Sequence, residues 1–207
     1  RKPCIYSEHG GWFLAPSAHY GPVFYNFLAR HHDLVLTNSG ILRGKILSTV
    51  RELACKVEVL YIGIDRTAYR KVGIPDLRRQ IGIPAENKVV GIVGRLVEAK
   101  GLDDFIRVAA GIRDCGVSGL SYVIVGSGSL REPLEKFARE SGVNIIFLGD
   151  RGDVPALLSI FDVFLFTSRW ESFGIVLLEA MASGVPVVGF STGGAVEILS
   201  RGGAIMV

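Results

Sequence analysis

From about residue 88 onward, short apolar runs alternate with segments in which apolar residues recur at helical spacing. The apolar runs are rich in Val, Ile and Phe and are nearly unbroken, which is typical of strands that are covered on both faces. They predict six strands, at 88–94, 121–126, 144–149, 162–167, 185–190 and 204–207.

Helices are predicted between these strands. Ser129 is a candidate N-cap for one of them, and Gly184 with Pro186 just beyond it is a stop signal for another. Strands that alternate with helices predict an α/β fold with a parallel sheet and helices on both faces. Ligands of such sheets bind beyond the carboxyl ends of the strands. The predicted helices cover 102–115, 129–141, 154–161, 173–183 and 194–201.

The first 85 residues have a less regular pattern. Segment 64–87 is polar and contains Gly and Pro, so we interpret it as a connection between two domains, 1–85 and 86–207. The chain begins with Arg, and its last apolar run has nothing after it, so we expect a fragment that is cut at both ends. The strands predicted in the first part are 4–9, 33–39 and 56–63, and the helices are 23–31 and 41–54.

The composition narrows the classes of protein. With 49% hydrophobic and 21% charged residues, the 207-residue chain is expected to be globular rather than disordered. A net charge of +3 is too small to indicate nucleic acid, although small anions remain candidate ligands. Three scattered Cys indicate reduced thiols in a cytosolic setting. No transmembrane run, signal peptide or metal-ligand spacing is visible.

Two carboxylates mark the segment 168–190. If a helix begins near Phe173, Glu171 lies at its entrance, and the free amides of Phe173, Gly174 and Ile175 form a site that attracts phosphate. A side chain added at Gly174 is then expected to block the ligand, while the helix tolerates it. Glu179 lies roughly 9 Å further along the axis and suits the paired hydroxyls of a ribose. The alternative is that Glu179 faces water and Glu171 only caps the helix.

Other candidates lie in the loops. Arg95 and Lys100 share one strand-to-helix loop and could bind an anion, or they could be solvated surface cations. The run 125–129 lacks the lysine of a phosphate-binding loop and favours a tight turn, and the glycine turn at 191–197 also follows a strand. His9 lies at the end of a predicted strand, beside two glycines, and could be functional or structural.

Four segments of the second part occur in the order of a known family. They are "GRLVEAKG" (94–101), "VIVGSGSLREPLEKFARESG" (123–142), "NIIFLGD" (144–150) and "SRWESFGIVLLEAMASGVPVVGFSTGGAVEIL" (168–199). Together they resemble the C-terminal domain of retaining, GT-B-fold glycosyltransferases, the glycosyl transferases group 1 family. The most specific feature is the pair of glutamates with seven residues between them. "HHDLVLTNS" (31–39) and "VLYIGID" (59–65) more weakly resemble the end of that family's N-terminal domain.

The resemblance implies a GT-B-type, Rossmann-like nucleotide-sugar-binding domain at 86–207, truncated at its end, plus part of a second, acceptor-side Rossmann-like domain at 1–85. It also implies a role for each candidate residue. Glu179 would hold the ribose of a nucleotide sugar, and Glu171 and His9 would approach the donor sugar. The amides of Phe173, Gly174 and Ile175 would meet the phosphate or sugar, Arg95 and Lys100 would neutralise the diphosphate, and the segment around Gly149 and Asp150 would touch the base.

The activity implied by the resemblance is transfer of a hexose from a nucleotide-sugar donor to a glycan, lipid-linked or small-molecule acceptor, with retention of configuration and without a cofactor or metal. The family's N-terminal glycine-rich loop is absent, so the resemblance allows for a fragment that is inactive by itself. It places the protein in the cytoplasm, with room for peripheral contact at the inner face of the membrane through the missing N-terminal part. A GT-B-fold sugar-nucleotide epimerase and a non-catalytic nucleotide-sugar-binding module stay open as alternatives.

Overall fold

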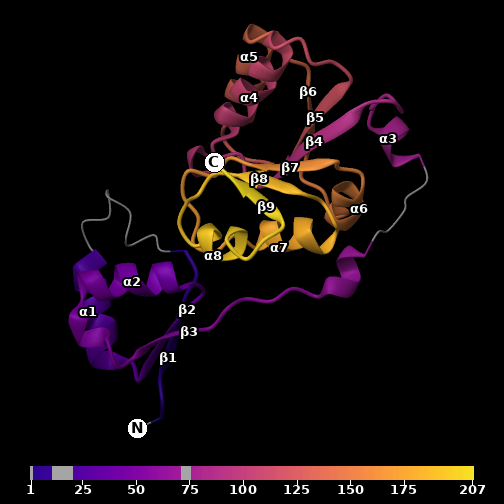
Figure 1. Ribbon diagram of the computed structural model, residues 1–207. Coiled ribbons are helices and arrows are strands. Elements are labelled where there is room, and N and C mark those ends of the chain that lie inside the picture. Colours follow the sequence, from indigo (N-terminus) through magenta and orange to yellow (C-terminus); the bar gives the residue numbers. More distant parts are fainter. Residues whose placement is uncertain (1, 11–20, 71–75) are drawn as a thin grey trace. The chain divides into compact units, whose positions relative to one another are not determined.

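The computed structural model describes residues 2–10, 21–70 and 76–207 (Figure 1). Its contacts divide the chain into two units, which are described separately. The first unit consists of Arg1–Gly63, Glu171–Gly174 and Gly193–Ile198. The second consists of Ile64–Trp170, Ile175–Thr192 and Leu199–Val207.

The first unit contains a parallel sheet in the order β1-β2-β3. Its strands are β1 (Ile5–Glu8), β2 (Leu34–Thr37) and β3 (Val57–Val59), joined through α1 (Gly21–His31), α2 (Gly40–Thr49) and the short 3-10 helix η2 (Arg51–Leu53). All three strands were predicted from the sequence. The core cluster is made by Tyr25, Leu28, Val35, Leu42, Ile46, Val50, Leu53 and Val57.

The helix expected over 41–54 is broken in two. Ser39 caps the start of α2, because its hydroxyl oxygen accepts a hydrogen bond from the Leu42 amide at 3.2 Å. At Val50 the backbone turns to an extended conformation, with φ of −142°, so α2 ends at Thr49. The 3-10 turn η2 begins directly after Val50, which is itself buried. The apolar spacing continues through the break, and the sequence pattern therefore did not reveal it.

The second unit contains a six-stranded sheet in the order β6-β5-β4-β7-β8-β9, and every neighbouring pair is parallel. This confirms the predicted α/β class and the six predicted strands. The strands are β4 (Lys88–Val93), β5 (Leu120–Val125), β6 (Ile145–Gly149), β7 (Val163–Phe166), β8 (Val187–Gly189) and β9 (Ala204–Met206).

Helices flank this sheet, with α4 and α5 together beside β4–β6 and with α6 and α7 along β7–β9 (Figure 1). The predicted N-cap Ser129 is wrong, because α5 begins after Leu130 and that position makes no side-chain cap bond. The helix expected from 173 begins two residues later, at Ile175. The helical elements are η3 (Arg66–Tyr69), α3 (Leu77–Gln80), η4 (Glu98–Lys100), α4 (Leu102–Asp114), α5 (Arg131–Glu140), α6 (Val154–Ser159), α7 (Ile175–Ala182) and α8 (Ala195–Leu199).

Asp162 ties the start of β4 to α3. Its Oδ2 atom accepts hydrogen bonds from the Val89 amide at 2.9 Å and from the Arg78 guanidinium at 3.0 Å. Its Oδ1 atom accepts from Lys88 at 3.0 Å. Burial alone would raise the pKa of Asp162, but these donors hold it below its usual value. The segment expected to be only a connection is therefore partly helical and is bonded to the second unit.

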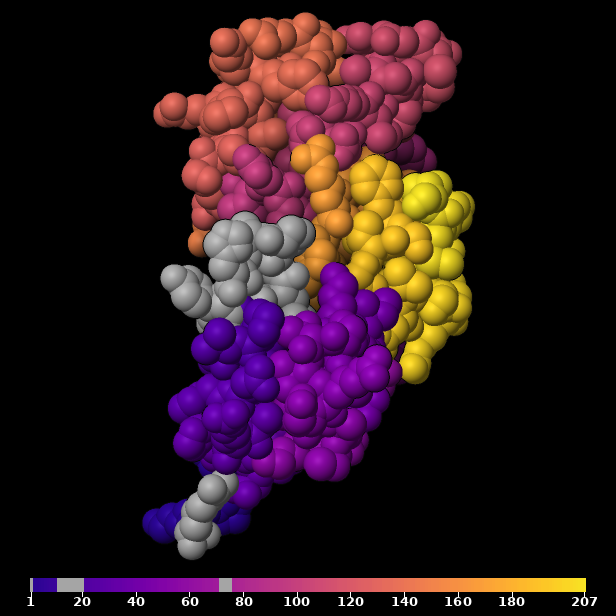
Figure 2. Space-filling view, turned by 90° about the vertical axis from the view of Figure 1, so that its left-hand side faces the viewer, coloured from indigo at the N-terminus to yellow at the C-terminus, as the bar shows by residue number. Residues whose placement is uncertain are grey.

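The outer strand β9 has an exposed apolar surface. Ile205 and Met206 are 64% and 44% exposed, and the C-terminal segment lies at the molecular surface (yellow in Figure 2).

Among residues 2–10, 21–70 and 76–207, no helix combines the length and the apolar character that crossing a bilayer requires. The same residues contain no cluster of three or more metal-ligating side chains.

The central strand β4 depends on a glycine. An added Cβ at Gly91 would lie 2.1 Å from Cε2 of Phe161, so the aromatic ring occupies the place of a side chain. Phe161 is 6% exposed and has little room to move away. Because β4 pairs with β5 on one side and β7 on the other, this contact lies at the centre of the sheet.

We predict that Gly91→Ala lowers the free energy of unfolding by about 1–3 kcal/mol through overpacking. Gly111→Ala in α4 is the matched control, because an added Cβ there meets nothing within 4 Å. The control should stabilise the helix by up to about 1 kcal/mol. Denaturant unfolding of these two variants, of Phe161→Leu and of Gly91→Ala/Phe161→Leu tests this. The double variant should lose less free energy of unfolding than the sum of the losses in Gly91→Ala and Phe161→Leu. Equal stability of Gly91→Ala and the parent would contradict the packing argument.

Candidate functional site

The loops after β4, β5 and β6 are bonded to one another at the carboxyl edge of the second unit's sheet. The Leu96 amide donates to the Ser127 carbonyl at 2.9 Å, and the Gly126 amide donates to the Gly149 carbonyl at 2.7 Å. Gly126 has φ of 131°, and a Cβ there would lie 2.0 Å from the carbonyl oxygen of Gly94. The glycines at 125–129 are thus required by close backbone packing, in agreement with the predicted tight turn.

The same loop brings the two predicted cations to the end of β4. The aliphatic part of Lys100 runs alongside Gly94, since Cδ of Lys100 would lie 3.8 Å from an added Cβ there. Arg95 is the next residue and is exposed. Among the described residues, its guanidinium has no hydrogen-bond partner and remains available to an anion. An arginine fork and a lysine point charge on one loop suit the oxygens of a diphosphate.

The residues that follow β7 are hydrogen-bonded to the loop that carries Lys100. The Thr167 hydroxyl donates to the Lys100 carbonyl at 3.0 Å, and the Arg169 amide donates to the Ala99 carbonyl at 2.9 Å. Gly101 has φ of 57°, and a Cβ there would lie only 2.2 Å from the Thr167 carbonyl oxygen. The position of Lys100 is therefore fixed by backbone contacts with a strand that lies far from it in sequence.

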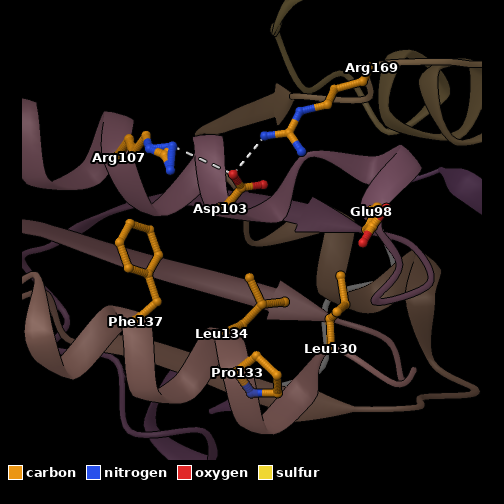
Figure 3. A pocket seen from close by; sticks show the side chains of 8 residues that line it. All are labelled: Glu98, Asp103, Arg107, Leu130, Pro133, Leu134, Phe137 and Arg169. Carbon is orange, nitrogen blue, oxygen red and sulfur yellow. Dashed lines mark hydrogen bonds and ion pairs between the residues drawn. The ribbon is translucent and has the colours of Figure 1, made fainter.

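Arg169 was not identified from the sequence. Its guanidinium donates to Asp103 at 2.6 Å and to Asp104 at 2.7 Å, both in the first turn of α4 (Figure 3 draws the Asp103 bond). Burial would raise the pKa of Asp103, but the hydrogen bond and charge of Arg169 keep it below its usual value. These bonds fix the loop after β7 two residues before Glu171. No local pattern could have indicated them, because the partners are 65 residues or more apart.

A pocket of about 330 Å³ lies between α4 and α5 (Figure 3). Its two arginines and Asp103 are already engaged with one another, since Asp103 lies 3.5 Å from Arg107 and 2.6 Å from Arg169. The guanidinium carbon of Arg107 also lies 5.3 Å from the Phe137 ring centre. None of the predicted site residues lines this pocket, so it is not the candidate site. Its lining residues are Glu98, Asp103, Arg107, Leu130, Pro133, Leu134, Phe137 and Arg169.

Glu179 lies in the second turn of α7 and is half-buried. Its Oε1 atom accepts a hydrogen bond from the Tyr69 hydroxyl at 2.8 Å. Burial, the hydrogen bond and the charge of Glu179 raise the pKa of Tyr69 to about 12. Glu179 is therefore not simply a solvated helix residue. Tyr69 was not identified from the sequence, because it lies 110 positions earlier, in the segment interpreted as a connection.

The residues before α7 differ from the expectation in one respect. Gly174 has φ of 94° and precedes the helix, so it is not a first-turn helical residue. Phe173 is buried, whereas Ile175 is 39% exposed. The Glu171 carbonyl accepts a hydrogen bond from the Gly194 amide at 2.9 Å, which joins the glycine turn at 191–197 to this segment. The expectation that Gly174 lies in the first turn of the helix is wrong, and a side chain at this φ would be strained.

His9 belongs to the first unit, at the end of β1. Its Nε2 atom lies 2.8 Å from the Ser7 hydroxyl, and the side chain is exposed. The backbone beside it is fixed, because the buried Glu8 carboxylate accepts from the Gly10 amide at 3.0 Å and Asn38 donates to the His9 carbonyl at 3.1 Å.

The second unit brings four of the predicted residues to the carboxyl ends of its strands. These are Arg95, Lys100, Gly149 and Asp150. Gly149 adopts φ of 70° at the end of β6, and Asp150 after it is exposed. Glu179 belongs to the same unit, on the helix that follows β7.

Comparison with known proteins identifies the family. The model of the family described as "Glycosyl transferases group 1" matches residues 73–205. The chain belongs to the glycosyl transferases group 1 family. This confirms the resemblance seen in the sequence, and the match includes both glutamates and the Arg95–Lys100 loop.

Relatives of this family member are glycosyltransferases. An uncharacterised glycosyltransferase of Methanocaldococcus jannaschii is 37% identical over 178 residues, which cover 81% of this chain and 44% of the relative. A GDP-mannose-dependent α-(1-6)-phosphatidylinositol monomannoside mannosyltransferase of Mycobacterium tuberculosis is 32% identical over 211 residues, covering 94% and 53%. The chain thus spans about half the length of these relatives.

Solved structures support the same conclusion. The crystal structure of Anabaena HepE in complex with UDP-glucose has a TM-score of 0.86 and 28% identity, and the match covers 100% of this chain and 58% of that one. The HepE complex with UDP and glucose gives a TM-score of 0.85 at 29% identity, with the same coverage. The family member therefore has the GT-B-type, Rossmann-like fold expected from the sequence.

We predict that Gly174→Ala destabilises the protein by about 1–3 kcal/mol, because a side chain at this φ is strained. Gly44→Ala in α2 is the control, since an added Cβ there meets nothing within 4 Å. It should leave stability unchanged or raise it by up to about 1 kcal/mol. The midpoints of thermal unfolding of the two unliganded variants decide the question. A Gly174→Ala variant as stable as Gly44→Ala would show that the turn adjusts to a side chain.

Proposed function

We propose that this chain forms the donor-binding part of an enzyme that transfers a sugar from a nucleotide-activated donor to an acceptor, with retention of the anomeric configuration. The observation that carries the proposal is the half-buried carboxylate of Glu179, eight positions after Glu171, in a member of this family. The two cations at the end of β4 support it, because a diphosphate leaving group needs positive charge.

Each predicted residue then has a task. Glu179 binds the ribose hydroxyls, and Arg95 with Lys100 binds the diphosphate. Glu171 and His9 face the donor sugar. The amides before and at the start of α7 approach the phosphate or sugar, and the segment around the end of β6 contacts the base. These last residues are Phe173, Gly174, Ile175, Gly149 and Asp150.

The difficult step is departure of the nucleoside diphosphate. The bond between the anomeric carbon and the diphosphate oxygen breaks with its electron pair going to the oxygen, while the acceptor oxygen bonds to the same face of that carbon. The acceptor proton passes to the leaving diphosphate or to solvent. Arg95 and Lys100 stabilise the negative charge that grows on the leaving oxygen, which is electrostatic catalysis. In this proposal the two side chains supply that charge without a metal ion.

The donor is proposed to be a nucleoside diphosphate hexose. HepE was solved with UDP-glucose, and the mycobacterial relative is GDP-mannose-dependent, so these two similar proteins differ in the base and the sugar of the nucleotide sugar. We propose a glycan, lipid-linked or small-molecule acceptor, a role in glycan biosynthesis, and a cytoplasmic location with peripheral contact at the inner face of the membrane.

The proposal is tested on the full-length protein. Thermal-shift measurements with UDP-, GDP- and ADP-sugars identify the donor, because a ligand that binds only the folded state raises the melting temperature. The labelled donor is then incubated with and without candidate acceptors. Transfer of label with release of nucleoside diphosphate supports the proposal. Conversion of the donor to another sugar nucleotide, or binding without any turnover, would overturn it in favour of an epimerase or a binding module.

We predict that Glu179→Ala weakens binding of the nucleoside diphosphate by about 10- to 150-fold, since hydrogen bonds to a charged acceptor are worth about 1.5–3 kcal/mol. The preference among donor sugars should change little, because the carboxylate acts on the ribose. Glu140→Ala at the end of α5 is a control for loss of an exposed helical glutamate. Calorimetric titration of each variant measures the affinity, and unchanged affinity in Glu179→Ala would remove the ribose assignment.

We predict that Arg95→Ala and Lys100→Ala each lower kcat by on the order of 100-fold or more, with a smaller effect on KM. The reason is that charge on the leaving group is larger in the transition state than in the bound donor. Arg139→Ala and Lys136→Ala, which remove exposed cations from α5, are the controls. Steady-state kinetics with a saturating acceptor separates the two constants. A raised KM at unchanged kcat would contradict a role in stabilising the leaving group.

A further inference from the structure

The turn that carries Tyr69 is shaped by its own sequence. Asp65 precedes η3 and its Oδ1 atom accepts hydrogen bonds from the Thr67 amide at 2.8 Å and the Thr67 hydroxyl at 2.7 Å. These bonds lower the pKa of Asp65, so the carboxylate is ionised at neutral pH. A capped 3-10 turn places its fourth residue, Tyr69, at a defined position relative to the cap.

The turn η3 is part of the second unit and packs against α6 and α7 (Figure 1). Tyr69 is half-buried, whereas the three other residues of η3 are exposed. The pKa of Tyr69, about 12, means that its hydroxyl is protonated at neutral pH. It therefore donates the hydrogen bond to Oε1 of Glu179, and the carboxylate accepts it.

Among residues 2–10, 21–70 and 76–207, the Tyr69 hydroxyl is the hydrogen-bond donor to the Glu179 carboxylate, which leaves acceptor capacity on it. An ionised carboxylate offers roughly four lone-pair sites on its two oxygens, and Tyr69 occupies one of them. A glutamate side chain otherwise samples many rotamers, and fixing it before a ligand arrives reduces the entropy lost on binding. A tyrosine ring packed on the helix can supply that fixation at low cost, because it has only two rotatable side-chain bonds.

We propose that Tyr69 is a positioning residue for the donor, whose hydroxyl holds the Glu179 carboxylate ready for the ribose hydroxyls. The inference rests on the proposed function, since it assigns Tyr69 to the ribose through Glu179. It differs from a purely structural role, in which the bond would only attach η3 to α7. It also differs from competition, in which Tyr69 would have to leave Glu179 before the ribose could bind.

The test is Tyr69→Phe in the full-length protein, which keeps the ring and removes the hydroxyl. Tyr122→Phe is the matched control, because Tyr122 lies in β5, is 7% exposed and belongs to the same unit. The probes are UDP, GDP and ADP and the 2′-deoxy form of whichever binds most tightly. Dissociation constants come from calorimetry, and kcat and KM from the transfer reaction with the matching nucleotide sugar.

Tyr69→Phe should weaken binding of the ribonucleotide by about 3- to 10-fold, the value of one ordinary hydrogen bond. Binding of the 2′-deoxynucleotide should change less, so the ratio of the two affinities narrows. KM for the donor should rise while kcat stays within about twofold of the parent. Tyr122→Phe should change none of these quantities. The ratio of ribonucleotide affinity to 2′-deoxynucleotide affinity is measured on the same protein sample. It therefore does not depend on the fraction of that variant that is folded.

Three outcomes would overturn the inference. Equal loss for both nucleotides, or no loss, would show that the bond is only structural. Tighter binding of the ribonucleotide by Tyr69→Phe would show that Tyr69 competes with the ribose for Glu179.

The Glu179→Ala variant separates this inference from the proposed function. If Glu179→Ala leaves ribonucleotide affinity unchanged, the assignment of Glu179 to the ribose is itself wrong. If Glu179→Ala weakens binding and Tyr69→Phe does not, only the role of Tyr69 is lost. In the Glu179→Ala background, Tyr69→Phe should have no additional effect.

Discussion

The organisation of the second unit depends on backbone segments that approach one another more closely than side chains would allow. At Gly101, Gly126 and Gly128 the loops after neighbouring strands meet backbone carbonyl oxygens directly. Hydrogen bonds between these loops then replace the ladder that ends with the strands. The loops at the carboxyl edge of the sheet are thereby bonded to one another rather than independent. The charged residues on these loops consequently have a fixed backbone.

This arrangement explains how ordinary residues become a site. The Lys100 backbone is held by Thr167, through a hydrogen bond to its carbonyl and through the close contact at Gly101, and Arg95 lies on the same loop. Arg169, bonded to Asp103 and Asp104, secures the chain just before Glu171. Glu179 has its own support in Tyr69. Lys100, Arg169 and Glu179 thus each have a second residue that limits their movement, which is the requirement for preorganised electrostatics. The Arg95 guanidinium has no such partner among the described residues.

Much of the fold could be predicted from the sequence, because the apolar runs of buried parallel strands are nearly continuous and Gly and Pro mark the ends of helices. The candidate residues Glu171, Glu179, Arg95 and Lys100 could be found because they stand out within short motifs. Local reasoning failed where distant segments decide the conformation. Gly174 leaves the helix, Val50 interrupts one, and Leu130 replaces Ser129 at the start of α5. Arg169 and Tyr69 pair with residues 65 or more positions away, and no periodicity records such contacts.

The contacts of Asp162 and Tyr69 have a consequence for building chimaeras. Arg78 is bonded to Asp162 and Tyr69 to Glu179, so residues before the first strand of the large sheet are integral to the unit that follows them. A hybrid joined at residue 86, where the strand pattern starts, would take Tyr69 and Arg78 from a different parent. Glu179 would then lose its donor Tyr69, and Asp162 would keep Lys88 and Val89 but lose Arg78. A junction before Asp65 would keep the cap, the tyrosine and the arginine with the helices and strands that they contact.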